Sequence, residues 1–293
     1  MYKSWSDTMK KLLFLLTILL ILLTGCGKEE PSQIVATTLP VYEFTNALCE
    51  GTGLTVSQLV TEDVSCLHDY TVQVRQMRAV ESAEVVVCNG AGLEEFLDDV
   101  LSSASQVIDA STDIVLSCGH DHGGEHHHEQ DPHIWLSPAN AKIMCQNIYK
   151  ELATLYPKHI GVFEKNLQVL LGKLDALQLY GETELAVLSC RDLITFHDGF
   201  TGFADSFDLH ILKAVEEESG SEASARELIE IIDLVRTEKL PAIFTETNGS
   251  TAAAQLIARE TGAKVYTLDM AISGSDYFEI MYRNIDTIKE ALQ

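Results

Sequence analysis

The histidines of this 293-residue chain are concentrated in one short stretch, residues 118–133, which reads CGHDHGGEHHHEQDPH. Six of the ten histidines lie there. Imidazole is the commonest metal-ligating side chain near neutral pH, and the glycines and acidic residues between the rings cannot form a packed core. A metal-handling loop is therefore the first hypothesis, and a solvated surface loop of the same composition is the alternative.

A second set of candidate ligands is spread over both halves of the chain. It consists of three histidines and one aspartate, His68, His133, His197 and Asp269. Each lies at the carboxyl end of a predicted strand or at the start of a predicted helix, the edge at which open α/β sheets bind ligands. We therefore expect the four side chains to meet in one cleft. Three imidazoles and one carboxylate form a closed tetrahedral set suited to zinc, with Zn–N distances of ~2.0–2.1 Å.

Three aspartates adjoin or nearly adjoin the candidate ligand histidines, namely Asp69, Asp131 and Asp198. A carboxylate that accepts a hydrogen bond from the other ring nitrogen of a ligand histidine fixes the tautomer and orientation of that ring. We predict this supporting role for all three aspartates. Taken singly, each histidine could equally be a hydrogen-bonded structural residue, so the joint placement carries the prediction.

The elements that must position these side chains alternate along the chain. Short runs rich in β-branched residues alternate with segments of helical periodicity, a pattern that predicts parallel sheets with crossover helices. The predicted strands are residues 34–39, 54–60, 84–89, 106–109, 185–190, 193–196, 210–215, 242–245 and 264–268. The predicted helices are residues 71–81, 93–102 and 138–152, one that begins at a capping box at Ser224, one near Ser250 and one from about residue 275 to the end.

A longer helix is predicted after Pro157. Apolar residues recur there with helical spacing at Ile160, Phe163, Leu167, Leu170, Leu171, Leu174 and Leu177. The pattern indicates a helix of roughly twenty residues, or about 30 Å. We therefore predict an α/β protein of two lobes with parallel-type sheets, joined by one long helix, with the metal site in the cleft between the lobes. The expected boundaries are an N-terminal lobe at 34–153 that includes the His-rich loop 119–130, a linking helix at 154–182 and a C-terminal lobe at 183–293.

The first residues have the pattern of a secretion signal. Lys10 and Lys11 precede an apolar run at residues 12–23, which is well short of the ~20 residues that a membrane-spanning helix needs. The run ends in Leu-Thr-Gly-Cys, which resembles a bacterial lipobox. That resemblance implies a signal peptide at 1–25, a lipidated Cys26 and a tether at 26–33. Ordinary secretion with a free Cys26 thiol is the alternative.

The composition is strongly acidic, with a formal net charge of −24. Removal of residues 1–25 would take away three lysines and one aspartate and leave a charge of −26. A field of this sign repels nucleic acid and attracts cations. We therefore expect no nucleic-acid partner.

Six cysteines other than Cys26 are spread over the chain, at positions 49, 66, 88, 118, 145 and 190. No two have the Cys-x-x-Cys spacing, so a zinc site of four thiolates is not indicated. An even number in an exported protein allows disulfides, and buried free thiols fit the apolar runs equally well.

Seven short motifs place the chain beside a known family. They are HDY at 68–70, NGAGLE at 89–94, DPHIWLSP at 131–138, FHDGF at 196–200, FTE at 244–246, ARETGA at 258–263 and LD at 268–269. On these motifs, residues 34–293 resemble the metal-binding lipoproteins of zinc and manganese ABC importers, the high-affinity zinc uptake solute-binding proteins of cluster A-I. The resemblance implies a non-enzymatic protein that captures Zn²⁺ and delivers it to a membrane permease.

The resemblance also implies roles for individual residues. His68, His133 and His197 would coordinate the ion, and Asp269 would complete the set. Manganese members generally carry Glu at the position of His197, so Zn²⁺ is favoured over Mn²⁺, in line with the softness of imidazole. Glu246 is interpreted as a structural carboxylate that lines the cleft. An auxiliary, weak capture role falls to the histidines of the loop, His120, His122, His126, His127 and His128.

The remaining expectations concern setting and partners. The protein would be extracytoplasmic, anchored by the lipid at Cys26 to the outer face of a bacterial cell membrane. It would act as a monomer with an ABC permease and its ATPase. Alternatives in the same family are a manganese-specific solute-binding protein and an adhesin. An exported zinc hydrolase is an alternative of another class, although the His-Glu-x-x-His signature of such enzymes is absent.

Overall fold

The computed structural model describes residues 32–62, 64, 67, 70–116, 131–216, 223–247, 249, 251–274 and 276–293. All of them belong to one compact unit, Ser32–Gln293. The predicted signal peptide, Cys26 and the His-rich residues 117–130 lie outside the described residues. In the described ranges, no helix has the length and apolar composition that crossing a membrane requires.

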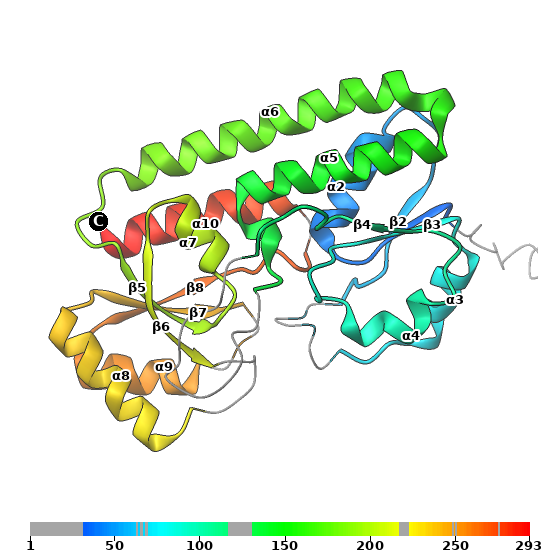
Figure 1. Ribbon diagram of the computed structural model, residues 1–293. Coiled ribbons are helices and arrows are strands. Elements are labelled where there is room, and N and C mark those ends of the chain that lie inside the picture. Colours follow the sequence, from blue (N-terminus) through cyan, green and yellow to red (C-terminus); the bar gives the residue numbers. More distant parts are fainter. Residues whose placement is uncertain are drawn as a thin grey trace, which may run out of the picture. The chain divides into compact units, whose positions relative to one another are not determined.

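The N-terminal lobe is built on a four-stranded parallel sheet of order β2-β1-β3-β4. Parallel neighbours need crossover connections, and short helices supply them (Figure 1). The strands are β1 (Ile34–Ala36), β2 (Val56–Gln58), β3 (Val85–Cys88) and β4 (Val107–Asp109), and the helices are α2 (Leu39–Cys49), α3 (Val74–Ser82) and α4 (Asp98–Leu101), the last preceded by a 3-10 turn (Glu95–Leu97).

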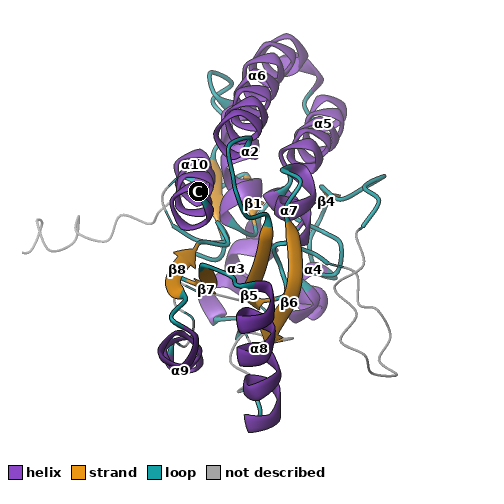
Figure 2. Ribbon diagram, turned by 90° about the vertical axis from the view of Figure 1, so that its left-hand side faces the viewer, coloured by secondary structure: helices purple, strands orange, loops and turns teal. Residues whose placement is uncertain are grey.

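The C-terminal lobe repeats this plan with a parallel sheet of order β6-β5-β7-β8. Its strands are β5 (Asp192–His197), β6 (His210–Glu216), β7 (Ala242–Glu246) and β8 (Lys264–Leu268), and its helices are α7 (Thr201–Ser206), α8 (Ala225–Glu238), α9 (Ala252–Thr261) and α10 (Tyr277–Leu292). Helices α8 and α9 cover the face of this sheet opposite to α7 and α10 (Figures 1 and 2). The capping box predicted at Ser224 is present, because its hydroxyl accepts from Glu227 N–H and Glu227 accepts from Ser224 N–H.

Two long helices connect the lobes. Helix α5 (Pro138–Leu155) is followed by a 3-10 turn (Pro157–His159) and by α6 (Ile160–Leu185), which has 26 residues. Helix α6 contacts α2 and α5 as well as α10, so it packs against helices of both lobes (Figure 1). Its buried residues follow the predicted stripe from Phe163 to Leu177. The predicted fold class, two parallel α/β lobes joined by one long helix, is confirmed.

One hydrophobic core runs beneath these long helices from lobe to lobe. Neighbouring strand residues face opposite sides, so Leu193 of β5 belongs to this shared core and Ile194 to a separate core under α8 and α9. In the N-terminal lobe, Ile34 faces the shared core and Val35 faces a smaller core that includes Val80 of α3. The lobes therefore share one apolar layer and each has an outer layer of its own.

Two local predictions are wrong. The apolar run 185–190 is not a strand, because α6 continues to Leu185 and residues 186–190 form a turn. The strand predicted at 34–39 ends at Ala36, because Pro40 near the N-terminus of α2 favours a helix start. Helix α2 was not predicted from the sequence, although its buried residues Val41, Phe44 and Leu48 have helical spacing.

The described cysteines are free thiols. Cys49, Cys88 and Cys145 are buried and Cys190 is half-buried. Cys66 and Cys118 lie outside the described residues. Buried free thiols, one of the two alternatives that the sequence left open, therefore describe Cys49, Cys88 and Cys145, and Cys190 is a half-buried free thiol.

Alanine substitutions at two glycines of α6 should change the stability of the protein in opposite directions. A Cβ at Gly181 would overlap the buried ring of Phe207, whereas a Cβ at Gly172 would meet nothing within 4 Å. Gly181→Ala should lower the free energy of unfolding by about 1–3 kcal/mol, the usual cost of overpacking a core. Gly172→Ala should raise it by about 0.5–1 kcal/mol, because alanine loses less backbone entropy on folding.

Urea unfolding of both variants measures these changes, with Gly172→Ala as the matched control in the same helix. Equal stability of the two variants would contradict the packing of α6 on Phe207.

Candidate metal centre

His133 is held by the aspartate two residues before it. Asp131 Oδ1 accepts the backbone N–H of His133 at 2.9 Å and lies 2.7 Å from its ring Nδ1. Both side chains are buried, and that of His133 is 3% exposed. A ring nitrogen that donates to a carboxylate leaves the lone pair on the opposite nitrogen, Nε2. Asp131 therefore directs the Nε2 lone pair of His133 away from the carboxylate, the orientation that a metal ligand needs.

His197 meets His133 from the other lobe. It is the last residue of β5, its side chain is 1% exposed, and its Nε2 lies 3.3 Å from Nε2 of His133. The two rings are nearly perpendicular, with an interplanar angle of 87°. Two Zn–N bonds of ~2.0–2.1 Å at a tetrahedral angle separate their nitrogens by about 3.3–3.4 Å. The spacing of the two rings therefore suits two ligands of one zinc ion.

Carboxylates lie beside His197 as well. Glu246 ends β7, the strand next to β5, and its buried Oε2 lies 4.0 Å from Nδ1 of His197. Asp198 follows His197 directly and is half-buried. Glu246 therefore lies beside the His197 ring at ion-pair distance, whereas Asp131 is hydrogen-bonded to the ring of His133.

Asp269 follows β8 and is engaged by its own turn and by α10. Its Oδ1 accepts Ala271 N–H at 2.9 Å, and its Oδ2 lies 3.0 Å from Nη2 of Arg283. Its main chain is clamped by the buried Asn284 amide, which accepts from Asp269 N–H and donates to Asp269 C=O. The carboxylate predicted as fourth ligand is therefore paired with an arginine in this structure.

Not all of the predicted set can be placed. His68 and Asp69 lie outside the described residues, as do His120, His122, His126, His127 and His128. Within the described part of the chain, no group of three or more His, Cys, Asp or Glu side chains is close enough to hold an ion. The structure therefore brings His133 and His197 together, and the complete ligand set stays a prediction.

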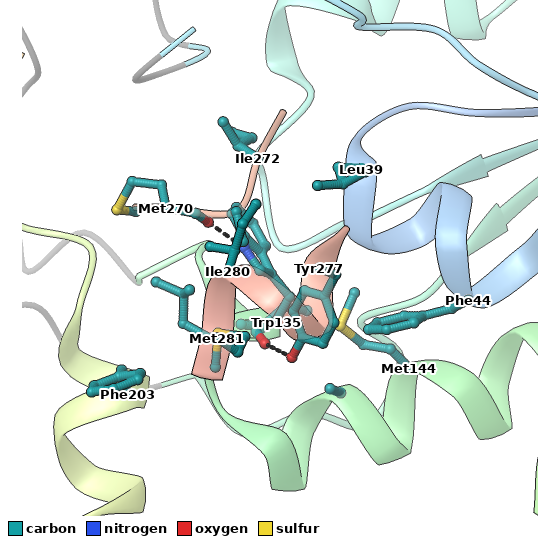
Figure 3. Close-up of a cluster of buried hydrophobic side chains, with 14 of the residues drawn as sticks. Leu39, Phe44, Trp135, Met144, Phe203, Met270, Ile272, Tyr277, Ile280 and Met281 are labelled. Carbon is teal, nitrogen blue, oxygen red and sulfur yellow. Dashed lines mark hydrogen bonds between the residues drawn. The ribbon is translucent and has the colours of Figure 1, made fainter. Parts of the chain in front are cut away.

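The His133 segment is bonded to the loop that follows Asp269. Trp135 Nε1 donates to Met270 C=O at 2.7 Å, and the Tyr277 hydroxyl donates to Trp135 C=O at 2.7 Å (Figure 3). Leu39 N–H adds a third bond between the lobes, to Ile272 C=O. These bonds fix the segment that carries His133 and the loop after Asp269 relative to one another.

A buried glutamate supports the same segment from below. Glu94 accepts hydrogen bonds from the Thr37 hydroxyl at 2.7 Å, Asn89 N–H at 2.7 Å and Gly90 N–H at 3.0 Å. The Asn89 amide then donates to Pro132 C=O, next to His133. Burial raises the pKa of the Glu94 carboxyl from its ordinary 4.5 to about 7. The motif at 89–94 thus positions the segment that carries His133, a role that was not predicted from the sequence.

Gly199 is a second residue whose role the sequence did not reveal. A Cβ there would lie 2.6 Å from Cε of Met270 and 2.8 Å from both Nδ1 of His133 and Cδ2 of His197. Real Cβ contacts of this length essentially do not occur. Glycine is therefore needed for the two rings to meet.

Comparison with known proteins gives a consistent result. A family model described as zinc-uptake complex component A, periplasmic (ZnuA), matches residues 34–291. A protein of Treponema pallidum that is named for metal binding is 30% identical over 290 residues, which are 91% of this chain and 92% of the relative. The zinc-binding lipoprotein AdcA of Streptococcus pneumoniae is 29% identical over 307 residues, 96% of this chain. The match spans 61% of AdcA, less than two thirds of its length.

Solved structures agree in fold. A crystal structure of ZnuA superposes with a TM-score of 0.78 at 30% identity, over 89% of this chain and 100% of that chain. The laminin-binding protein Lmb of Streptococcus agalactiae, described as bifunctional with adhesin and metal transporting activity, superposes with a TM-score of 0.77 at 26% identity, with the same coverage.

The lack of space for a side chain at Gly199 predicts that a substitution there lowers the affinity for zinc. Gly199→Ala should weaken zinc binding by about tenfold or more. The added methyl group displaces the rings, and a displacement that costs ~1.4 kcal/mol of binding free energy already lowers the affinity tenfold. Gly202→Ala is the matched control, since a Cβ there would meet Ser137 at an ordinary 3.5 Å. Zinc titration against a competing chelator measures both. Unchanged affinity in Gly199→Ala would show that the rings tolerate the methyl group.

Glu94 predicts how stability depends on pH. Its folded-state pKa of about 7 exceeds the ordinary 4.5, so between these values the folded chain keeps a proton that the unfolded chain has lost. The contribution of Glu94 to stability is therefore complete below the ordinary pKa and falls as the pH rises toward 7, by about 3 kcal/mol at ~1.4 kcal/mol per pKa unit.

Glu94→Gln should flatten the fall in unfolding free energy between about pH 5 and about pH 7.5, measured by urea unfolding. Glu43, whose pKa burial also raises to about 7, contributes equally to both proteins and cancels in the difference. Parallel pH profiles would rule out a protonated Glu94 in the folded chain.

Proposed function

This chain belongs to the ZnuA family of periplasmic zinc-uptake components, and on that premise we propose that it captures Zn²⁺ outside the cytoplasm and delivers it to the permease of an ABC importer. The observation that carries the proposal is the 3.3 Å separation of the two Nε2 atoms, contributed by different lobes. Imidazole nitrogen is a ligand that suits zinc better than it suits a harder ion such as manganese.

The proposed ligands are His68, His133, His197 and Asp269. Asp131 orients His133 by its hydrogen bond, and Glu246 lies beside His197. We extend the supporting role to Asp69 and Asp198, which adjoin ligand histidines. The histidines at 120–128 are proposed as weak collectors that raise the local concentration of the ion.

Transport rather than catalysis follows from the family, since solute-binding proteins of transporters are not enzymes. A zinc hydrolase keeps one coordination position open for water. The proposed fourth ligand, Asp269, would close that position. We therefore propose that the chain has no enzymatic activity of its own.

The setting of the protein is also proposed. Its family is periplasmic, and the relative AdcA is named a lipoprotein, which supports lipidation at Cys26 and anchoring to the outer face of the cell membrane. The partners would be a permease and its ATPase, with the binding protein as a monomer.

Adhesion is a second candidate function. It is supported by the likeness to Lmb, which is described as both an adhesin and a metal transporter. The two functions can be separated in a deletion strain. A growth defect that appears only under zinc limitation indicates transport, and lost attachment to laminin at ample zinc indicates adhesion.

The metal assignment yields a direct prediction. The purified chain without residues 1–25 should retain one zinc ion by elemental analysis, and about a tenfold excess of Mn²⁺ should not displace it. His133→Ala and His197→Ala should each weaken zinc binding by more than the ~10–100-fold that loss of a supporting carboxylate costs.

His210→Ala is the control, because this histidine is largely exposed on β6 and pairs with Asp192. If the chain retained Mn²⁺ tightly and zinc did not displace it, the assignment of zinc would be wrong and a manganese-specific binder would be favoured.

A further inference from the structure

Arg283 is paired with the carboxylate of Asp269, the proposed fourth ligand. We propose that its guanidinium competes with the captured metal for the Asp269 carboxylate and so lowers the affinity for zinc to a level that permits release. The inference rests on the proposed function, with Asp269 as a ligand. It concerns a residue outside the predicted ligand and supporting set.

The first support is the pairing itself. Nη2 of Arg283 lies 3.0 Å from Oδ2 of Asp269. In the described part of the chain, this is the carboxylate with which Arg283 forms an ion pair. The Asp269 carboxylate, the proposed ligand, is thus paired with the positive charge of Arg283 before the metal ion arrives.

The second support is that the main chain around Asp269 is held by hydrogen bonds to other segments. Asn284, next to Arg283 on α10, holds Asp269 N–H and C=O at 2.9 and 2.7 Å. Ala271 adopts a left-handed φ of 53° that strains a non-glycine residue, and the carbonyls on either side of it accept bonds from Trp135 and Leu39. The backbone is therefore fixed, and exchange at the carboxylate is left to its side chain and to Arg283.

The third support is exposure. The side chain of Arg283 is 54% exposed, whereas that of Asp269 is 19% exposed. An ion pair open to solvent on one side contributes little to stability, so Arg283 can turn into water at small cost when zinc enters. The same guanidinium can return when the ion leaves, which assists delivery.

Electrostatics gives the direction of the effect. A divalent ion bound to Asp269 would lie within a few ångströms of the guanidinium charge and be repelled by it. Removing that charge should therefore tighten zinc binding. A merely structural arginine would have the opposite effect, since its loss would disorder Asp269 and weaken binding.

The test compares Arg283→Gln with Arg283→Lys in the chain without residues 1–25. Zinc affinity is measured by chelator competition, the release rate by stopped-flow transfer to a chelator, and folding by thermal unfolding. Arg283→Gln should bind zinc about tenfold more tightly and release it more slowly, as expected for loss of one opposing charge at a partly solvated site. Arg283→Lys keeps the charge and should stay close to the wild type.

A double-mutant cycle shows whether Arg283 acts through Asp269. In the Asp269→Asn background, Arg283→Gln should no longer tighten binding. The inference is overturned if Arg283→Gln leaves affinity unchanged or weakens it, or if the tightening persists without the Asp269 carboxylate. Either result leaves the proposed function intact as long as the wild type binds zinc. A wild type that retains no zinc overturns both.

Discussion

Two buried imidazole rings with their Nε2 atoms 3.3 Å apart form the constraint on which the rest of the structure depends. Lone pairs at that distance repel each other unless a proton or a cation lies between them, and burial excludes the water that would screen them. The protein maintains the arrangement from behind, with Asp131 on one ring and Glu246 beside the other. The rings are thus oriented before an ion arrives, which reduces the ordering that binding must impose.

The fold holds the two rings in position through the way its main chain joins the lobes. Each ring belongs to a different lobe, so its position depends on how the lobes are joined. Helix α6 packs against helices of both lobes over a shared core, and the hydrogen bonds of Trp135 connect the His133 segment directly to Met270 and Tyr277. A joint of this kind restricts relative motion of the lobes far more than a flexible linker would.

The parts that the sequence could predict are those encoded by local periodicity. Alternating runs predicted both parallel sheets, and the stripe that begins near Phe163 predicted α6. Where local patterns are ambiguous the prediction failed, as at α2, which was not predicted and whose first residue, Leu39, was assigned to a strand, and at residues 185–190. Gly199, Glu94 and Arg283 could not be assigned their roles, because each depends on contacts between segments that only the folded chain brings together.

The edge-on contact of Trp135 with His133, 5.4 Å between ring centroids, has a spectroscopic consequence. Within residues 26–293, Trp135 is the single tryptophan, and it is fully buried. Its indole N–H donates to the carbonyl of Met270, next to Asp269. The chromophore therefore contacts both the His133 ring and the loop after Asp269. The tryptophan fluorescence of residues 26–293 should therefore respond to a change at the His133 ring without an added label.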